Sequence, residues 1–214
     1  MSDDMHSGHR ERLRERYAAV GEEGLADHEL LELLLTYCIP RRDTNPLAHE
    51  LLTRFGGLSG VLNAEIAELT GVPGVGGSGA VFLRLQKDLQ KRIRLEGICG
   101  TRGKARLHTP LLSAKYALAM LEGKHYETVM AVCLNAKREV LSHQVLQEGS
   151  LTEAQVYPRR IAELALTRRA HSILLMHNHP SGSPVPSPAD RETTRAVREA
   201  LTGIGVLLTD HLIT

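Results

Sequence analysis

The sequence contains no tryptophan, and phenylalanine and tyrosine together make up only 3% of its 214 residues. Proteins that bind single-stranded nucleic acid without sequence preference stack the bases on aromatic side chains, so this mode of binding is not indicated. The hydrophobic core must therefore consist mostly of leucine, valine, isoleucine and alanine.

Cysteine is also scarce, because only Cys38, Cys99 and Cys133 are present. They are odd in number, far apart in the chain and not arranged as a C-x-x-C pair, which excludes a disulfide framework and a cysteine-based zinc site. We expect three reduced thiols that pack as small apolar side chains.

No apolar run is long enough to span a membrane, and the charged stretch from Met1 to Arg16 has no signal-peptide core. The formal net charge is +1, with acidic and basic residues interspersed, so overall electrostatics indicate neither a membrane nor a nucleic acid as partner. We expect a cytoplasmic protein without a membrane partner, in which any DNA contact is local.

The most informative stretch begins with the apolar run Ile173–Met176, which is typical of a strand buried on both faces. The run stops at His177-Asn178-His179, followed by a loop rich in proline and glycine. Because side chains alternate along a strand, His177 and His179 should project from the same face and Asn178 from the opposite one.

After the loop, Ser187 and Pro188 are typical of a helix N-cap and first helical residue, which places Asp190 in the first turn. Two imidazoles and one carboxylate can therefore converge, and this is the composition of a catalytic zinc site with one position open to water. The alternative is a capping box of Ser187 and Asp190 beside two exposed histidines. The two interpretations are compatible, since a serine hydroxyl can both accept and donate.

The string H-N-H-P-S-G-x-P-x-P-S-x-x-D, residues 177–190, resembles the JAMM (MPN-plus) metalloprotease signature and specifically its bacterial RadC branch. The resemblance implies that His177, His179 and Asp190 bind one zinc ion per chain. It also implies that Ser187 helps to stabilise the oxyanion and that an upstream glutamate acts as general base.

For the base, the resemblance favours Glu127, which precedes the predicted strand 128–134. Spacing alone does not distinguish it from Glu148 and Glu153, and each of the three could instead be an ordinary exposed carboxylate. Asp210 and His211 are interpreted as supporting or structural groups, because His177, His179 and Asp190 already satisfy a catalytic site.

The first half of the sequence, residues 1–96, predicts an all-helical domain. Its segment 69–76 resembles a helix-hairpin-helix motif, in which Gly74 and Gly76 would let the turn approach a phosphate. Lys87, Lys91 and Arg92 follow on the next helix and could add phosphate contacts. Alternatively, the hairpin is a packing or protein-contact element and the basic residues form a solvated helix face.

Residues 97–106 are the predicted linker, and residues 107–214 the predicted catalytic domain. Helices and strands alternate in this domain, which indicates an α/β protein with a layered sheet. The expected elements are helices at 110–122, from 158, and 187–201, and strands at 128–134, 139–146 and 206–209. The resemblance implies a JAMM/MPN-like, cytidine-deaminase-like α-β-α arrangement with a mixed sheet, and a further stretch of chain after Asp210–Ile213.

The sequence thus favours a zinc-dependent hydrolase that acts on a peptide or isopeptide bond in a peptide or protein substrate. A first alternative is a DNA-binding or DNA-processing protein, associated with repair through the RadC resemblance, that contacts DNA through its N-terminal domain. A second is a non-catalytic interaction module, against which the complete set of ligands, serine and glutamate argues.

Overall fold

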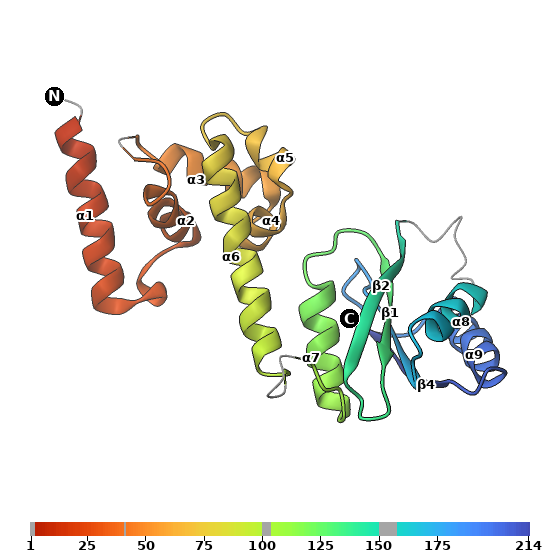
Figure 1. The fold of residues 1–214 in the computed structure, drawn as a ribbon. Coiled ribbons are helices and arrows are strands. Elements are labelled where there is room, and N and C mark those ends of the chain that lie inside the picture. Colours follow the sequence, from red (N-terminus) through yellow and green to blue (C-terminus); the bar gives the residue numbers. More distant parts are fainter. Residues whose placement is uncertain (1–2, 41, 100–103, 150–157) are drawn as a thin grey trace. The chain divides into compact units, whose positions relative to one another are not determined.

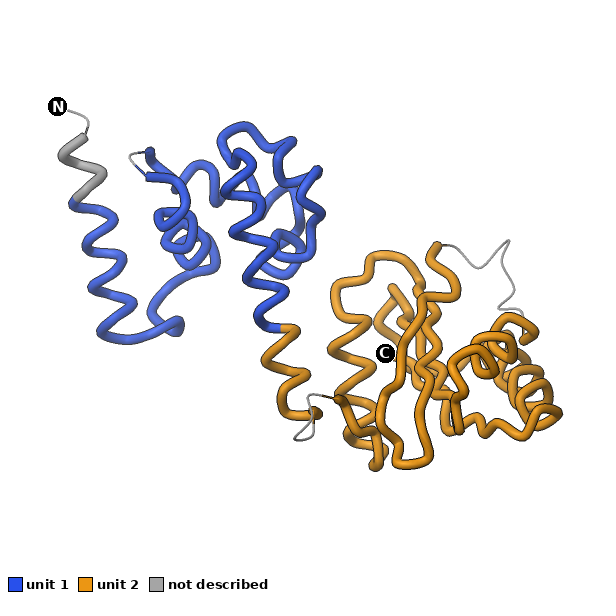
Figure 2. Tube along the Cα trace, in the orientation of Figure 1, with its two compact units in different colours: residues 1–90 blue, residues 91–214 orange. Residues whose placement is uncertain are grey.

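The computed structural model describes residues 3–40, 42–99, 104–149 and 158–214. The chain divides into two compact units, residues 1–90 and residues 91–214, coloured separately in Figure 2. The boundary between them falls within the long helix α6 (Gly76–Glu96). Within the described residues, no helix combines the length and the apolar character needed to cross a lipid bilayer.

The first unit is built from helices, as the sequence predicts. They are α1 (Asp3–Val20), the short 3-10 helix η1 (Glu22–Gly24), α2 (Asp27–Thr36), α3 (Asn45–Phe55), α4 (Leu58–Asn63), α5 (Ile66–Thr70) and the start of α6. Their apolar faces enclose a leucine-rich core that includes Leu31, Leu35, Leu51, Leu69 and Leu83. This core needs no aromatic residue at its centre, in keeping with the composition.

Local sequence signals explain where these helices begin and end. Helix α3 carries Pro46 in its first turn and ends before Gly56, which adopts the left-handed conformation at φ 75°. Helix α2 begins at Asp27, but its N-cap is Ala26, whose N–H donates to the Glu29 carboxylate at 3.0 Å. Asp27 therefore lies in the first turn of α2 and not at its cap, and Glu29 reaches back to satisfy the free backbone donor of Ala26.

The second unit alternates helices and strands. They are α7 (Pro110–Leu121), β1 (Thr128–Leu134), β2 (Val140–Glu148), α8 (Pro158–Thr167), β3 (Ser172–His177), α9 (Pro188–Thr202) and β4 (Leu207–Ile213). The strands form one sheet in the order β2-β1-β3-β4. Strand β1 is antiparallel to both β2 and β3, whereas β3 and β4 are parallel, so the sheet is mixed.

Helices cover both faces of this sheet (Figure 1). Helix α7 packs on one face, against Met130 and Val132 of β1 and Leu174 and Met176 of β3. Helices α8 and α9 pack on the other face, where Val129, Ala131, Cys133, Ile173 and Leu175 form the floor of a second core. The unit is thus an α-β-α sandwich, as predicted.

Cys38, Cys99 and Cys133 are all free thiols.

The last strand is longer than the sequence predicts. Strand β4 extends to Ile213 and pairs along the whole of β3, because backbone hydrogen bonding continues where the polar pair Asp210-His211 interrupts the apolar pattern. Within the predicted linker, Ile98 and Ala105 are buried in the core beneath α7. Residues 100–103 of that linker lie outside the described residues.

Candidate metal centre

The site is formed where β3 ends. His177 is the last residue of this strand and is 1% exposed, and His179 follows it by two residues. Their Nε2 atoms lie 3.0 Å apart. Both imidazoles therefore face a common point, as the alternation of side chains predicts.

The carboxylate of Asp190 reaches the same point from the first turn of α9. Its Oδ1 lies 3.3 Å from His177 Nε2, and its Oδ2 lies 3.4 Å from His179 Nε2. Ser187 is the N-cap of this helix: its Oγ accepts from the Asp190 N–H at 3.1 Å, and its own N–H donates to Asp190 Oδ2 at 2.7 Å. The capping box and the ligand cluster coexist, because Asp190 takes part in both.

The spacing of these three residues suits a tetrahedral metal ion. Ligand atoms of a tetrahedron with metal–ligand bonds of about 2.0–2.1 Å lie roughly 3.3 Å apart. The separations from His177 Nε2 to His179 Nε2, 3.0 Å, and to Asp190 Oδ1, 3.3 Å, are close to that value. With Glu127 included, one ligand atom from each of four residues lies within 4.8 Å of the others. These residues could hold a metal ion.

Burial and hydrogen bonding affect the protonation of His177 and Asp190 and the tautomer of His179, the three candidate ligands. Burial lowers the pKa of His177, which favours the neutral imidazole. His179 Nδ1 lies 2.7 Å from the carbonyl oxygen of Ser183, which can only accept, so Nδ1 carries the hydrogen. Burial alone would raise the pKa of Asp190, but hydrogen bonds from Ser187 and the nearby imidazoles outweigh it and lower that pKa.

Glu127 lies immediately before β1. Burial raises the pKa of its carboxyl group, and His179 opposes this rise. A carboxylate that takes up a proton more readily than usual is suited to act as a base beside the cluster. Of its competitors, Glu148 is exposed and pairs with Lys124 at 2.7 Å, and Glu153 lies outside the described residues.

Asn178 forms hydrogen bonds to the backbone of the loop that carries Glu127, a role that the sequence does not reveal. Its Oδ1 accepts from the Thr128 N–H at 2.9 Å. Its Nδ2 donates to the carbonyl oxygens of Lys124 at 3.2 Å and Tyr126 at 3.1 Å. The backbone is thus held on both sides of Glu127. Strand alternation predicts the direction of Asn178, but not its partners about 50 residues earlier in the chain.

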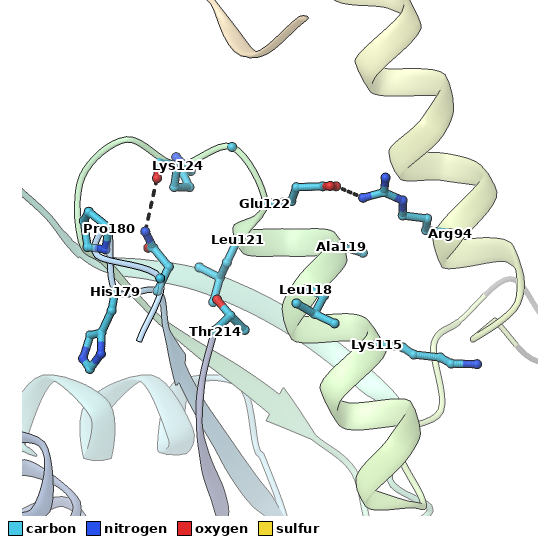
Figure 3. Close-up of a pocket in the computed structure, with 13 residues that line it drawn as sticks. Arg94, Lys115, Leu118, Ala119, Leu121, Glu122, Lys124, His179, Pro180 and Thr214 are labelled. Atoms are coloured by element: carbon cyan, nitrogen blue, oxygen red, sulfur yellow. Dashed lines mark hydrogen bonds and ion pairs between the residues drawn. The ribbon is translucent and has the colours of Figure 1, made fainter. Parts of the chain in front are cut away.

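A cavity of about 690 Å³ opens on the α7 face beside this loop (Figure 3). Helix α7 lines it with Leu118, Ala119 and Leu121, and the segment after β3 lines it with His179 and Pro180. Glu122 forms an ion pair with Arg94 at its edge. His179 is the metal-cluster residue that reaches this cavity.

The glycine hairpin lies in the first unit, between α5 and α6. Gly74 and Gly76 adopt positive φ angles of 100° and 64°, which glycine tolerates best. The guanidinium group of Arg42 lies against Gly74, and Arg54 Nη1 donates to the Gly71 carbonyl at 3.4 Å. Lys87 lies about three helical turns beyond Gly76, roughly 16 Å along the axis of α6, and Lys91 and Arg92 lie farther along it. The structure does not gather these three residues at the hairpin.

Comparison with known proteins gives similarity along nearly the whole chain. Residues 107–214 match the family of RadC-like JAB domains, and residues 5–81 match the UPF0758 N-terminal family. A UPF0758 protein of Fusobacterium nucleatum is 35% identical over 217 aligned residues, which cover 100% of this chain and 94% of that protein. A UPF0758 protein of a Geobacillus species is 38% identical over 203 residues, covering 94% and 88% of the two chains.

The hydrogen bonds of Asn178 lead to a first prediction. The change Asn178→Ala leaves the Thr128 N–H without its acceptor in a buried position, so we expect the free energy of unfolding to fall by about 2–3 kcal/mol. Chemical denaturation measures this difference, with the exposed Lys137→Ala as control. An Asn178→Ala protein as stable as the wild type would show that these bonds do not hold the loop.

Proposed function

The chain belongs to the family of RadC-like JAB-domain proteins, and we propose that it is a zinc-dependent hydrolase that cleaves peptide or isopeptide bonds in a peptide or protein substrate. The observation that supports this most directly is the convergence of two imidazoles, one aspartate and one glutamate within 4.8 Å at the end of a buried strand. Structural zinc sites use four protein ligands, whereas catalytic sites use three and leave one position open.

The donor set favours zinc, at one ion per chain. His177, His179 and Asp190 would hold it through two nitrogen atoms and one oxygen atom, and no cysteine is involved. Zinc in such a site would supply Lewis acidity, which polarises a substrate carbonyl and lowers the pKa of water.

Glu127 is the proposed general base. Its carboxylate would take the proton of the attacking water and deliver it to the leaving amine, because the raised pKa makes the protonated form accessible. Asn178 supports this role by holding the backbone on both sides of Glu127. The role depends on position as well as pKa, since a general base must lie within hydrogen-bond reach of the proton that it removes.

Ser187 is the proposed donor to the oxyanion. Its hydroxyl donates to Asp190 Oδ2 at 2.7 Å in this structure, so donation to a substrate oxygen requires the hydroxyl hydrogen to turn away from Asp190. The Ser187 N–H would still hold Asp190 in place at 2.7 Å. A donor that strengthens its bond only as negative charge develops on the substrate would accelerate the reaction.

A second candidate function is DNA binding through the N-terminal unit. The placement of Arg42 and Arg54 beside the glycine hairpin favours it, because positive charge beside a glycine turn suits a phosphate. The two functions are compatible, since the hairpin and the metal cluster belong to different units.

Zinc content is the first test. We expect purified wild-type protein, prepared without a nickel-affinity tag, to contain about one zinc ion per chain by plasma mass spectrometry. His179→Ala should lose this zinc, because one of the three ligands is removed. Well-folded wild-type protein without any metal would leave only the capping box of Ser187 and Asp190 and would count against hydrolysis.

Substitution of the base separates chemistry from metal binding. Glu127→Gln should keep the zinc and reduce turnover by about 10²–10⁴-fold, because an amide cannot accept the proton. The rates would be measured on libraries of peptide and lysine-linked isopeptide substrates. Hydrolysis by Glu127→Gln at the wild-type rate would show that another group is the base. Zinc-loaded wild-type protein that cleaves no substrate would favour the non-catalytic interaction module.

DNA binding makes a separate prediction. The whole chain should bind duplex DNA with an affinity that falls steeply with salt, and the double change Arg42→Glu and Arg54→Glu, beside the glycine hairpin, should weaken it and reduce the salt slope by about 1 per lost contact. Lys137→Glu with Arg168→Glu reverses two exposed charges elsewhere and serves as control. Equal effects of the two double changes would indicate non-specific attraction and not a defined surface.

A further inference from the structure

A chain of hydrogen bonds runs from the proposed ligand His177 to the backbone of Asp190. His177 Nδ1 lies 2.8 Å from His211 Nε2, on the neighbouring strand β4. His211 Nδ1 lies 2.6 Å from Thr194 Oγ1, on α9. Thr194 Oγ1 donates to the carbonyl oxygen of Asp190 at 2.6 Å. Three elements, β3, β4 and α9, are joined by this chain.

The carbonyl oxygen at the end sets the direction of every bond. Two oxygen atoms 2.6 Å apart need a hydrogen between them, and a backbone carbonyl has none to give, so the Thr194 hydroxyl hydrogen must point at Asp190. Thr194 Oγ1 is then free only to accept, and the hydrogen in its contact with His211 must come from His211 Nδ1.

The same logic continues to His177. A neutral imidazole carries one hydrogen, so His211 with its hydrogen on Nδ1 has a lone pair on Nε2. Both ring nitrogens of His211 face neutral groups, the His177 imidazole and the Thr194 hydroxyl, and neither faces a carboxylate, so the neutral ring with a single hydrogen fits this site. His177 Nδ1 must therefore donate, which leaves the lone pair of His177 Nε2 directed at His179 and Asp190.

We propose that His211 and Thr194 are positioning residues that fix the ring orientation and tautomer of His177, and thereby raise the affinity of the site for zinc. The proposal rests on the proposed metal binding. The reversed chain would put a hydrogen on His177 Nε2 and block it as a ligand, so the direction of these bonds decides whether His177 can bind. The tautomer of His179 is fixed independently, because its Nδ1 donates to the carbonyl oxygen of Ser183.

A purely structural role for His211 is the competing explanation, since it lies between β4 and α9. Four variants of the full-length chain separate the two. His211→Leu removes both hydrogen bonds, whereas His211→Gln can still offer an acceptor to His177. Thr194→Val removes the hydroxyl at similar shape, and Thr194→Ser restores it. Leu207→Ala, an exposed position on β4, is the control.

Two measurements are made on each variant. The first is the dissociation constant for zinc, by competition with a chromogenic chelator. We expect His211→Leu and Thr194→Val to weaken zinc binding by about 10–100-fold, with His211→Gln and Thr194→Ser recovering most of the loss. The second is the tautomer of His177 in the zinc-free protein, by long-range ¹H–¹⁵N correlation of the ring nitrogens. The wild type should carry the hydrogen on Nδ1, and Thr194→Val should show a mixture.

The outcomes separate this proposal from the proposed function. If Thr194→Val and His211→Leu are folded and bind zinc within about twofold of the wild type, the positioning role is overturned while the zinc site stands. If the wild type binds no zinc, the proposed function fails, and the tautomer alone tests the chain of bonds. A wild-type His177 with its hydrogen on Nε2 overturns the proposal in either case. If His211→Leu does not fold, the zinc affinity of Thr194→Val decides whether the positioning role holds.

Discussion

The parallel pairing of β3 with β4 is the constraint on which the candidate metal centre depends. Two parallel neighbours need a crossover, so the chain must leave the end of β3 and return along α9 to the start of β4. The end of β3 and the first turn of α9 are joined only by the loop after His179, which brings Asp190 to the two imidazoles. Strand β4 then runs in the same direction as β3, and its last residues arrive beside His177.

The antiparallel pairing of β1 with β3 completes the site. Val129 pairs with His177, so the start of β1 lies beside the end of β3, and Glu127 precedes that start by one residue. If β1 ran parallel to β3, Glu127 would lie at the other end of the strands, away from His177. The site therefore requires a mixed sheet, with one neighbour of β3 antiparallel and the other parallel. Asn178 reinforces this junction, since it bonds to the Thr128 N–H directly.

Which residues of the site can be predicted from the sequence depends on how far apart they lie along the chain. His177, His179, Ser187 and Asp190 lie in one strand-loop-helix segment, so alternation and capping rules suffice to bring them together. Glu127 reaches them only through strand pairing, which spacing does not reveal, and only family resemblance singles it out. His211 lies 34 residues from its partner His177, on a strand whose polar residues hide its true length. The fold is easier to predict from the sequence than the site, because apolar runs and helix caps mark each helix and strand locally.

The electrostatics of the centre argue for a cation at its middle. Two imidazole lone pairs 3.0 Å apart repel one another and the adjacent carboxylate, unless a proton or a metal ion lies between them. Burial lowers the pKa of His177, which disfavours the proton. Hydrogen bonds from Ser187 lower the pKa of Asp190, so the cluster holds a negative charge among neutral donors. A divalent cation would satisfy both lone pairs and the carboxylate at once. Because the capping box already orders Asp190, that cation would meet a carboxylate that is held in place.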